Sequence, residues 1–81
     1  MEYCVYVLKS VSHRTRYVGS TRDIKARLEQ HNTGKVRYTS GRRPWVLVYT
    51  EEYSSRSEAM RREKSLKTGS GRAELNGILV E

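Results

Sequence analysis

Five side chains of this sequence carry groups that can act together in one catalytic site. They are the phenols of Tyr6 and Tyr17, the guanidinium of Arg27, the imidazole of His31 and the carboxylate of Glu63. A Mg²⁺ ion commonly takes one or two carboxylates and completes its shell with water and phosphate oxygens, so Glu63 alone is a sufficient protein ligand. An arginine such as Arg27 can neutralise the charge that builds on a phosphate during hydrolysis. The set predicts a site that cleaves phosphodiester bonds with one divalent ion, Mg²⁺ or Mn²⁺.

Helical periodicity aims Arg27 and His31 at the interior of the protein. In a helix predicted over residues 23–33, Ile24 and Leu28 define the inward stripe. At about 100° per residue, His31 falls beside Ile24, between the stripe and Arg27, and Arg27 falls at the edge of the stripe. The alternative for His31 is a partly exposed histidine that caps or packs near the end of the helix.

Glu63 is aimed inward by the same argument. In the second predicted helix, Ala59, Met60 and Leu66 define the inward stripe, and Glu63 projects between the first two. An isolated charge is costly to bury, so it survives on an inner face only if it is paired or lines a cleft open to water. The alternative to a functional site is therefore a structural salt bridge between Glu63 and Arg27.

The elements that must position these groups begin with a hairpin. Residues 3–8 are rich in β-branched and aromatic side chains, and residues 16–19 resume that pattern after polar turn chemistry, which predicts two antiparallel strands. Asp23 is placed to cap the first helix, and Asn32-Thr33-Gly34 is placed to end it.

The second half of the chain alternates a loop, a strand and helices. Residues 35–44 contain four basic residues and no period, which predicts an exposed loop, and residues 45–49 are apolar on both faces, which predicts a strand covered on both. The spacing of Ser55 and Glu58 is that of a capping box, so the second helix is expected from residue 55 to about residue 67.

A short third helix is expected over residues 72–79, after Gly69 and Gly71 break the chain. Three apolar residues form one stripe that can dock against the core. They are Leu75, Ile78 and Leu79.

Composition narrows the class of protein. A chain of 81 residues is expected to form one domain over residues 1–81. Its 16 Lys and Arg against 9 Asp and Glu give a formal charge of +7, which favours a nucleic-acid partner, although solubility alone is the alternative. No stretch approaches the roughly 18 apolar residues of a membrane span, and no signal peptide is recognised. The single Cys4 excludes an internal disulfide, so a cytoplasmic protein is expected.

The order and spacing of these residues resemble the GIY-YIG family, which includes phage homing endonucleases, the incision subunit of bacterial excision repair and structure-selective DNA nucleases. Cys4-Val5-Tyr6 occupies the first motif and Tyr17-Val18-Gly19 the second; Arg27 and His31 follow on the first helix and Glu63 on the second. The sequence is most similar to small stand-alone bacterial members. Two departures are Cys4 in place of a glycine and Val5 in place of an isoleucine.

The resemblance implies an α+β fold, a three-stranded antiparallel sheet flanked by two to three helices in the order β-β-α-β-α-α. It implies that Glu63 holds the metal, that Arg27 binds the scissile phosphate, and that Tyr6 accepts a proton from the attacking water while Tyr17 and His31 position or polarise it. His31 is the alternative base, because a free tyrosine has a pKa of about 10. Asn76 would correspond to a late asparagine that often lies near the metal in this family. The implied substrate is DNA, cut in repair or recombination.

Seven basic residues are expected in loops or at strand ends, where they can reach phosphate: Arg14, Arg16, Arg22, Lys35, Arg37, Arg42 and Arg43. Such contacts position a nucleic-acid backbone without reading its sequence. Tyr38 and Trp45 could stack on an unpaired base, although a tryptophan that opens a strand is more often core. A second basic run is expected on the solvent face of the second helix and comprises Arg61, Arg62, Lys64 and Lys67.

Two other functions are compatible with the sequence. The first is a catalytically silent nucleic-acid-binding module on the same scaffold, in which binding does not need Glu63. The second is a protein-interaction module whose charge is solubilising and whose Arg27 and Glu63 form a structural pair. Larger relatives carry attached domains for targeting, so a protein partner that supplies targeting is also expected.

Overall fold

The structure is a computed structural model that describes residues 2–79. Its elements in chain order are β1 (Tyr3–Ser10), β2 (Arg16–Thr21), α1 (Ile24–Asn32), the 3₁₀ turn η1 (Ser40–Arg42), β3 (Trp45–Tyr53), α2 (Arg56–Leu66) and α3 (Gly69–Leu79). The predicted α+β class and the order β-β-α-β-α-α are confirmed. Within the described residues, no helix is both long enough and apolar enough to cross a bilayer.

The sheet contains three antiparallel strands in the order β2-β1-β3, with β1 in the centre. Tyr6 on β1 pairs with Gly19 on β2, and Val7 pairs with Val18. Because successive side chains of a strand point to opposite faces, the first pair lies on one face of the sheet and the second pair on the other.

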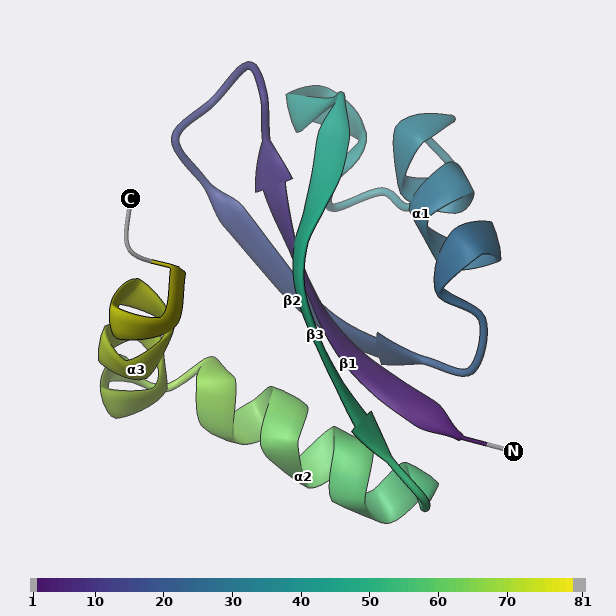
Figure 1. Ribbon diagram of the computed structural model, residues 1–81. Coiled ribbons are helices and arrows are strands. Elements are labelled where there is room, and N and C mark those ends of the chain that lie inside the picture. Colours follow the sequence, from purple (N-terminus) through teal and green to yellow (C-terminus); the bar gives the residue numbers. More distant parts are fainter. Residues whose placement is uncertain (1, 80–81) are drawn as a thin grey trace.

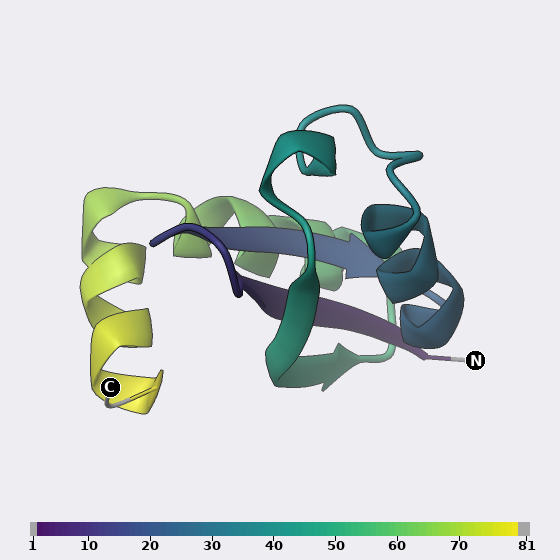
Figure 2. The same ribbon diagram turned by 90° about the horizontal axis from the view of Figure 1, so that it is seen from above.

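Helices cover the two faces of the sheet unequally, with α1 on one side and α2 and α3 on the other (Figure 1). The view from above separates α1 from α3 across the strands (Figure 2). On the α1 face, Tyr6, Leu8 and Trp45 are buried, and Ile24 and Leu28 pack against them as the helical stripe predicted. This face carries the part of the candidate site that is formed by Tyr6, Tyr17, Arg27 and His31.

The core on the opposite face is aliphatic and joins the sheet to α2 and α3. Its buried members are Val5, Val7, Val18, Ala59, Leu66 and Leu75. Burial of apolar area on both faces of β1 explains why this strand has a nearly continuous apolar sequence instead of an alternating one.

Both predicted helix N-termini are capped by the residues that the sequence indicated. Asp23 accepts a hydrogen bond from the backbone amide of Ala26 at 3.1 Å, and Ser55 accepts one from Glu58 at 3.2 Å. Each cap satisfies an amide that has no partner within its own helix. The caps therefore fix where α1 and α2 begin.

The third strand differs from the prediction in length and in cover. It continues past the predicted range 45–49 to Tyr53, and Val46, Leu47 and Val48 are 37–45% exposed, so the expected cover on both faces is wrong. The reason is that β3 lies at the edge of the sheet, and a register shift against β1 skips Val48. An apolar run alone does not distinguish an edge strand from a central one.

Two apolar helical residues expected in the core are exposed instead. Met60 on α2 is 50% exposed and Ile78 on α3 is 41% exposed, whereas Ala59, Leu66 and Leu75 are buried. The buried stripe of each helix is narrower than periodicity suggested, because two short helices share one face of a small sheet.

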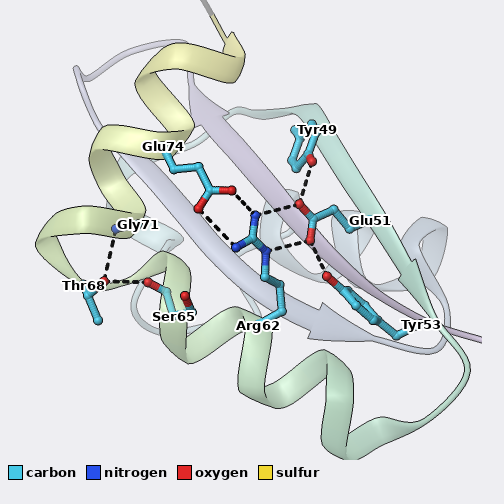
Figure 3. Close-up of polar contacts among 8 residues, drawn as sticks. All are labelled: Tyr49, Glu51, Tyr53, Arg62, Ser65, Thr68, Gly71 and Glu74. Carbon is cyan, nitrogen blue, oxygen red and sulfur yellow. Dashed lines mark hydrogen bonds and ion pairs between the residues drawn. The ribbon is translucent and has the colours of Figure 1, made fainter.

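The third helix begins at Gly69, earlier than predicted, and Gly71 does not break the chain. The hydroxyl of Thr68 accepts a hydrogen bond from the Gly71 amide at 3.1 Å, which satisfies an amide of the first turn (Figure 3). A Cβ atom on Gly71 would collide with the carbonyl oxygen of Ser65 and with Leu66. Gly71 is therefore the point where α2 and α3 come closest.

A polar network, which we call the Glu51 network, ties β3 to both C-terminal helices (Figure 3). Its members are Tyr49, Glu51, Tyr53, Arg62 and Glu74. Arg62 donates from Nε to Glu51 Oε1 at 2.8 Å and from Nη2 to Glu74 Oε2 at 2.6 Å. Both tyrosine hydroxyls donate to Glu51 at 2.6 Å. The prediction that Arg62 lies on the solvent face of its helix is wrong.

Candidate active site

Tyr6 lies at the centre of the candidate site because its strand partner is a glycine. A Cβ atom built on Gly19 would lie 2.5 Å from the hydroxyl oxygen of Tyr6 and 3.1 Å from the Tyr17 ring. The Tyr6 ring can therefore cross β2 only because Gly19 has no side chain. This gives a packing reason for the glycine of the second motif.

His31 hydrogen-bonds to the hydroxyl of Tyr6 as part of a buried chain of hydrogen bonds. The Tyr6 oxygen is 2.9 Å from His31 Nε2, and His31 Nδ1 is 2.8 Å from Thr39 Oγ1. Thr39 donates its own proton to the carbonyl of Val36, so it accepts from His31 Nδ1–H. His31 Nε2 is then the acceptor for the Tyr6 proton.

The surroundings keep His31 neutral. The imidazole is fully buried, unlike the partly exposed histidine considered as an alternative. Desolvation and the nearby Arg27 charge both lower the pKa of His31. In a neutral imidazole whose Nδ1 carries the proton, Nε2 has a free lone pair that accepts the hydrogen bond from the Tyr6 hydroxyl.

Arg27 contacts both phenols from α1. Its Nε is 3.4 Å from the Tyr6 oxygen, and its Nη1 donates to Gln30 at 2.9 Å. Hydrogen bonding to Tyr6, and more weakly to Tyr17, raises the pKa of Arg27. Within residues 2–79 no carboxylate forms an ion pair with Arg27, so its guanidinium keeps capacity to bind an anion.

Tyr6 is more deeply enclosed than the sequence predicted. The whole residue is buried, and desolvation raises the pKa of Tyr6 to about 12, despite the hydrogen bond from Arg27 that lowers it. The expected wet groove thus does not reach this phenol. The half-buried Arg27 is a second hydrogen-bond partner of the Tyr6 oxygen beside His31.

Tyr17 joins this buried group to the surface. Its ring centroid lies 4.8 Å from that of His31, 6.3 Å from that of Tyr6 and 5.7 Å from that of Tyr38. Tyr17 is half-buried and also lines an open groove on the surface. We call Tyr6, Tyr17, Arg27 and His31 the Tyr6 cluster.

Glu63 lies on α2, beside the edge strand β2. Its Oε1 accepts from Ser20 Oγ at 2.7 Å, and its Oε2 pairs with Lys67 Nζ at 2.7 Å. Lys67 Nζ is also 5.8 Å from the Tyr17 ring centroid, and the charge of Glu63 contributes to the raised pKa of Tyr6. Glu63 therefore stands next to the Tyr6 cluster, and no ion pair joins it to Arg27 among the described residues.

The donor set at Glu63 fits a weakly held divalent ion. The side chain is 23% exposed, so water and an ion can reach it. No group of three or more His, Cys, Asp or Glu side chains suitable for a metal gathers anywhere in residues 2–79. A single carboxylate suits Mg²⁺ or Mn²⁺, which retain several waters, and does not suit a structural zinc ion.

Asn76 lies apart from Glu63 in its contacts. It is exposed on α3 and accepts a hydrogen bond from Arg16 Nη2 at 2.8 Å. Both residues line the same open groove as Tyr17, about 1090 Å³ in volume, which runs between the β1–β2 hairpin and α3. The accessory role beside the metal stays a prediction without a contact to support it.

The seven predicted phosphate contacts divide among three places. Arg14 and Arg16 line the groove beside Tyr17. Arg22 lies over the ring of Tyr3, on the other side of the Glu63 region. The remaining four belong to the segment between α1 and β3, and are Lys35, Arg37, Arg42 and Arg43. A single continuous fringe is therefore not formed.

The aromatic residues of that segment differ in exposure. Trp45 is 2% exposed and donates from Nε1 to the carbonyl of Thr39 at 2.9 Å, so it is core and cannot stack on a base. Tyr38 is 65% exposed, with the Arg42 guanidinium 5.9 Å from its ring centroid. Tyr38 remains the aromatic side chain accessible for stacking at the groove.

Sequence reasoning missed three residues that shape the site, Ser20, Thr39 and Arg72, and it missed the pairing of Lys67 with Glu63. Lys67 follows Glu63 by four residues on one helix, and the rule for such pairs could have found it. Thr39 carries no signal, because its contact with His31 depends on the path of an irregular loop.

Comparisons with known proteins match nearly the whole chain. The model of the GIY-YIG catalytic domain matches residues 2–76. The UPF0213 protein SH2523 of Staphylococcus haemolyticus is 46% identical over 78 residues, which cover 95% of this chain and 94% of that protein. A UPF0213 protein of Staphylococcus aureus is 46% identical over 65 residues, which cover 79% of this chain and 78% of that protein.

A solved structure supports the fold independently. The solution NMR structure of the UPF0213 protein BH0048 from Bacillus halodurans has a TM-score of 0.58 and 34% sequence identity. The match covers 96% of this chain and 85% of that chain.

Proposed function

The chain belongs to the GIY-YIG family of nuclease domains, which bind nucleic acid, and from that premise we propose that it is a metal-dependent endonuclease that hydrolyses DNA phosphodiester bonds. The proposed ion is Mg²⁺ or Mn²⁺. The proposed substrate is branched or damaged DNA, because residues that contact backbone do not read sequence. We further propose that the protein works in the cytoplasm, in repair or recombination.

One observation carries this proposal: among the described residues, Arg27 hydrogen-bonds to the neutral side chains of Tyr6 and Gln30 and forms an ion pair with no carboxylate. A guanidinium in a structural salt bridge has its donors consumed. Arg27 is half-buried and forms no such ion pair within residues 2–79, so a phosphate can bind to its guanidinium.

The chain's own residues offer a route for a proton. Arg27 binds the phosphate, and the long 3.4 Å contact between Arg27 and Tyr6 is weak enough to break as it does so. The Tyr6 oxygen then accepts a proton from the attacking water while its own proton passes to His31 Nε2. Tyr6 is the catalytic residue in this scheme, and His31 acts behind it as a positioning residue with Thr39.

Two features lower the cost of this transfer. The acceptor nitrogen of His31 is already 2.9 Å from the Tyr6 oxygen, so no rearrangement is needed. A Mg²⁺ or Mn²⁺ held by Glu63 supplies Lewis-acid stabilisation of the phosphate and its bound water. Without such a route, a phenol whose pKa is about 12 is a poor base near neutral pH.

The test is nicking of a panel of branched, nicked and flapped DNA molecules with Mg²⁺ or Mn²⁺. Glu63→Gln is expected to reduce nicking at least about 100-fold. Glu52→Gln is the matched control, since Glu52 is exposed on β3 outside the candidate site, and it is expected to retain activity. Metal-loaded wild-type protein that cuts no member of the panel would contradict the proposal.

A second candidate function is a silent nucleic-acid-binding module. The burial of Tyr6, with its pKa of about 12, favours it, because the predicted base is neither exposed nor acidic. In that case DNA binding is salt-sensitive, survives Glu63→Gln unchanged, and no substrate is cleaved. Binding and cleavage measured on the same panel separate the two functions.

A further inference from the structure

Lys67 connects Glu63 to the surface groove. It is the C-cap residue that directly follows α2, its Nζ lies 2.7 Å from Glu63 Oε2, and its side chain is 48% exposed. The same Nζ lies 5.8 Å from the ring centroid of Tyr17. One ammonium group therefore contacts the carboxylate and borders the aromatic wall of the groove.

We propose that Lys67 is a displaceable counter-ion of Glu63, which a divalent cation replaces and which then contacts a substrate phosphate in the groove. The inference rests on the proposed function, in which Glu63 holds the ion. It adds a substrate-binding residue and a physical link between loading of the ion and binding of DNA.

Competition follows from the oxygens of Glu63. Oε1 is engaged by the neutral Ser20 hydroxyl, whereas Oε2 is engaged by a full positive charge. A divalent cation at this carboxylate meets Lys67 as a like charge a few ångströms away, and like charges repel. The Ser20 contact can persist while the Lys67 contact is lost.

Displacement of Lys67 is inexpensive. The pair is half-exposed and links residues four apart on one helix, and such pairs contribute little to stability. Lysine has a flexible stem with a compact charge, so its ammonium can move several ångströms without moving the helix.

The displaced Lys67 ammonium can move into the groove. Lys67 lines it together with Arg16 from β2 and Arg72 from α3, and Tyr38 lies on its exposed wall. Three basic side chains from three elements around one open groove match the regular charges of a nucleic-acid backbone. We therefore expect the strand that continues from the scissile phosphate to lie here.

The first experiment measures Mn²⁺ binding to the intact protein without DNA, by calorimetry or by the electron paramagnetic resonance of unbound Mn²⁺. Lys67→Met is expected to bind Mn²⁺ about two- to fivefold more tightly than wild type, the range of an exposed ion pair. Lys64→Met is the matched control: it removes an equal charge from the neighbouring turn, where Lys64 is exposed. It is expected to change the affinity by less than Lys67→Met does.

The outcomes distinguish this inference from the proposed function. Equal Mn²⁺ affinities for wild type and Lys67→Met would overturn the counter-ion role while leaving Glu63 as the ligand. Mn²⁺ binding that Glu63→Gln leaves unchanged would overturn the proposed metal site itself, and with it the displacement of Lys67.

A second experiment follows the displaced ammonium onto DNA. In a Tyr6→Phe background, which prevents cleavage, the affinity for a DNA hairpin with a single-stranded flank is measured against salt concentration. With Mn²⁺, Lys67→Met is expected to lower the slope of log affinity against log salt by about 0.7–0.9, one phosphate contact. Without Mn²⁺, the slopes of the Tyr6→Phe protein with and without Lys67→Met are expected to agree. An unchanged slope with Mn²⁺ would overturn the proposed phosphate contact.

Discussion

The protein contains two groups of side chains with nearly the same composition and different connectivity. The Glu51 network and the Tyr6 cluster with Glu63 each contain two tyrosines and an arginine, with two glutamates in the former and one glutamate and a histidine in the latter. In the Glu51 network the arginine is clamped between two carboxylates and both phenols donate to one of them. In the Tyr6 cluster the arginine contacts phenols, and the glutamate pairs elsewhere.

The difference appears in the electrostatics. Arg62 and the two phenols lower the pKa of Glu51 to about 2, and Glu51 in turn raises the pKa of Tyr49 to about 12. These groups satisfy one another, so the network has nothing left to offer a ligand. Tyr6 has an equally raised pKa for a different reason, which is desolvation.

The comparison teaches that residue types alone do not identify a site. A guanidinium surrounded by carboxylates holds structure together, whereas a guanidinium that hydrogen-bonds only to neutral groups can still bind an anion. The two groups also lie in different parts of the fold. The Glu51 network joins β3, α2 and α3, whereas the Tyr6 cluster lies between the sheet and α1.

The largest expected effects come from replacing each of the two arginines, Arg27 and Arg62, by alanine. Arg27→Ala should reduce DNA nicking at least about 100-fold with little change in stability, because it removes a phosphate-binding group together with a long contact to Tyr6 and an exposed hydrogen bond to Gln30. Arg62→Ala should lower the free energy of unfolding by about 3 kcal/mol, because it leaves Glu51, whose side chain is only 16% exposed, without its charged partner. Nicking assays and urea unfolding of both variants check this. Loss of activity from Arg62→Ala in folded protein, with none from Arg27→Ala, would reverse the assignment.

The next effect isolates the packing on which the Tyr6 cluster depends. Gly19→Ala should destabilise the protein by about 2 kcal/mol, because its Cβ would lie 2.5 Å from the Tyr6 oxygen. Gly77→Ala is the matched control, since nothing lies within 4 Å of the position of its Cβ, and a helical alanine should be neutral or stabilising. Equal unfolding midpoints for the two variants would show that the Tyr6 ring does not need Gly19.

The smallest effect is a pH dependence confined to the Glu51 network. The pKa of Glu51 is lowered from 4.5 to about 2, so its contribution is complete above pH 4.5 and is lost as the pH falls toward 2. Between pH 5 and pH 3 the wild type should lose about 1 kcal/mol more stability than Glu51→Gln, after allowance for partial exposure. Urea midpoints at each pH provide the measurement. Parallel curves for the two proteins would contradict the assigned pairing.

Local sequence signals predicted where α1 and α2 begin and which face of α1 contributes to the Tyr6 cluster. Asp23 and Ser55 cap helices because a short polar side chain can reach a free amide, which depends only on neighbouring residues. His31 was placed inward by helical periodicity and is fully buried. Such features need no knowledge of the rest of the fold.

Features that depend on distant segments were not predictable. The exposure of Val48 follows from the edge position of β3, and the burial of Arg62 follows from its contact with Glu74 on the next helix. Thr39 reaches His31 through an irregular loop. Periodicity shows which face of an element is inward, but it does not show which strand lies at an edge or which loop closes over a site.

The central claim is that the region of Glu63, and not that of Glu51, meets a divalent ion beside the Tyr6 cluster. Titration of the protein with Mn²⁺, followed through broadening of its amide resonances, tests this directly. Broadening is predicted to centre on Glu63, Ser20 and Lys67 and to extend to Tyr6, with Glu51 affected much less. Broadening that centres on Glu51 and Glu74, or that spreads evenly over the acidic residues, would contradict the account.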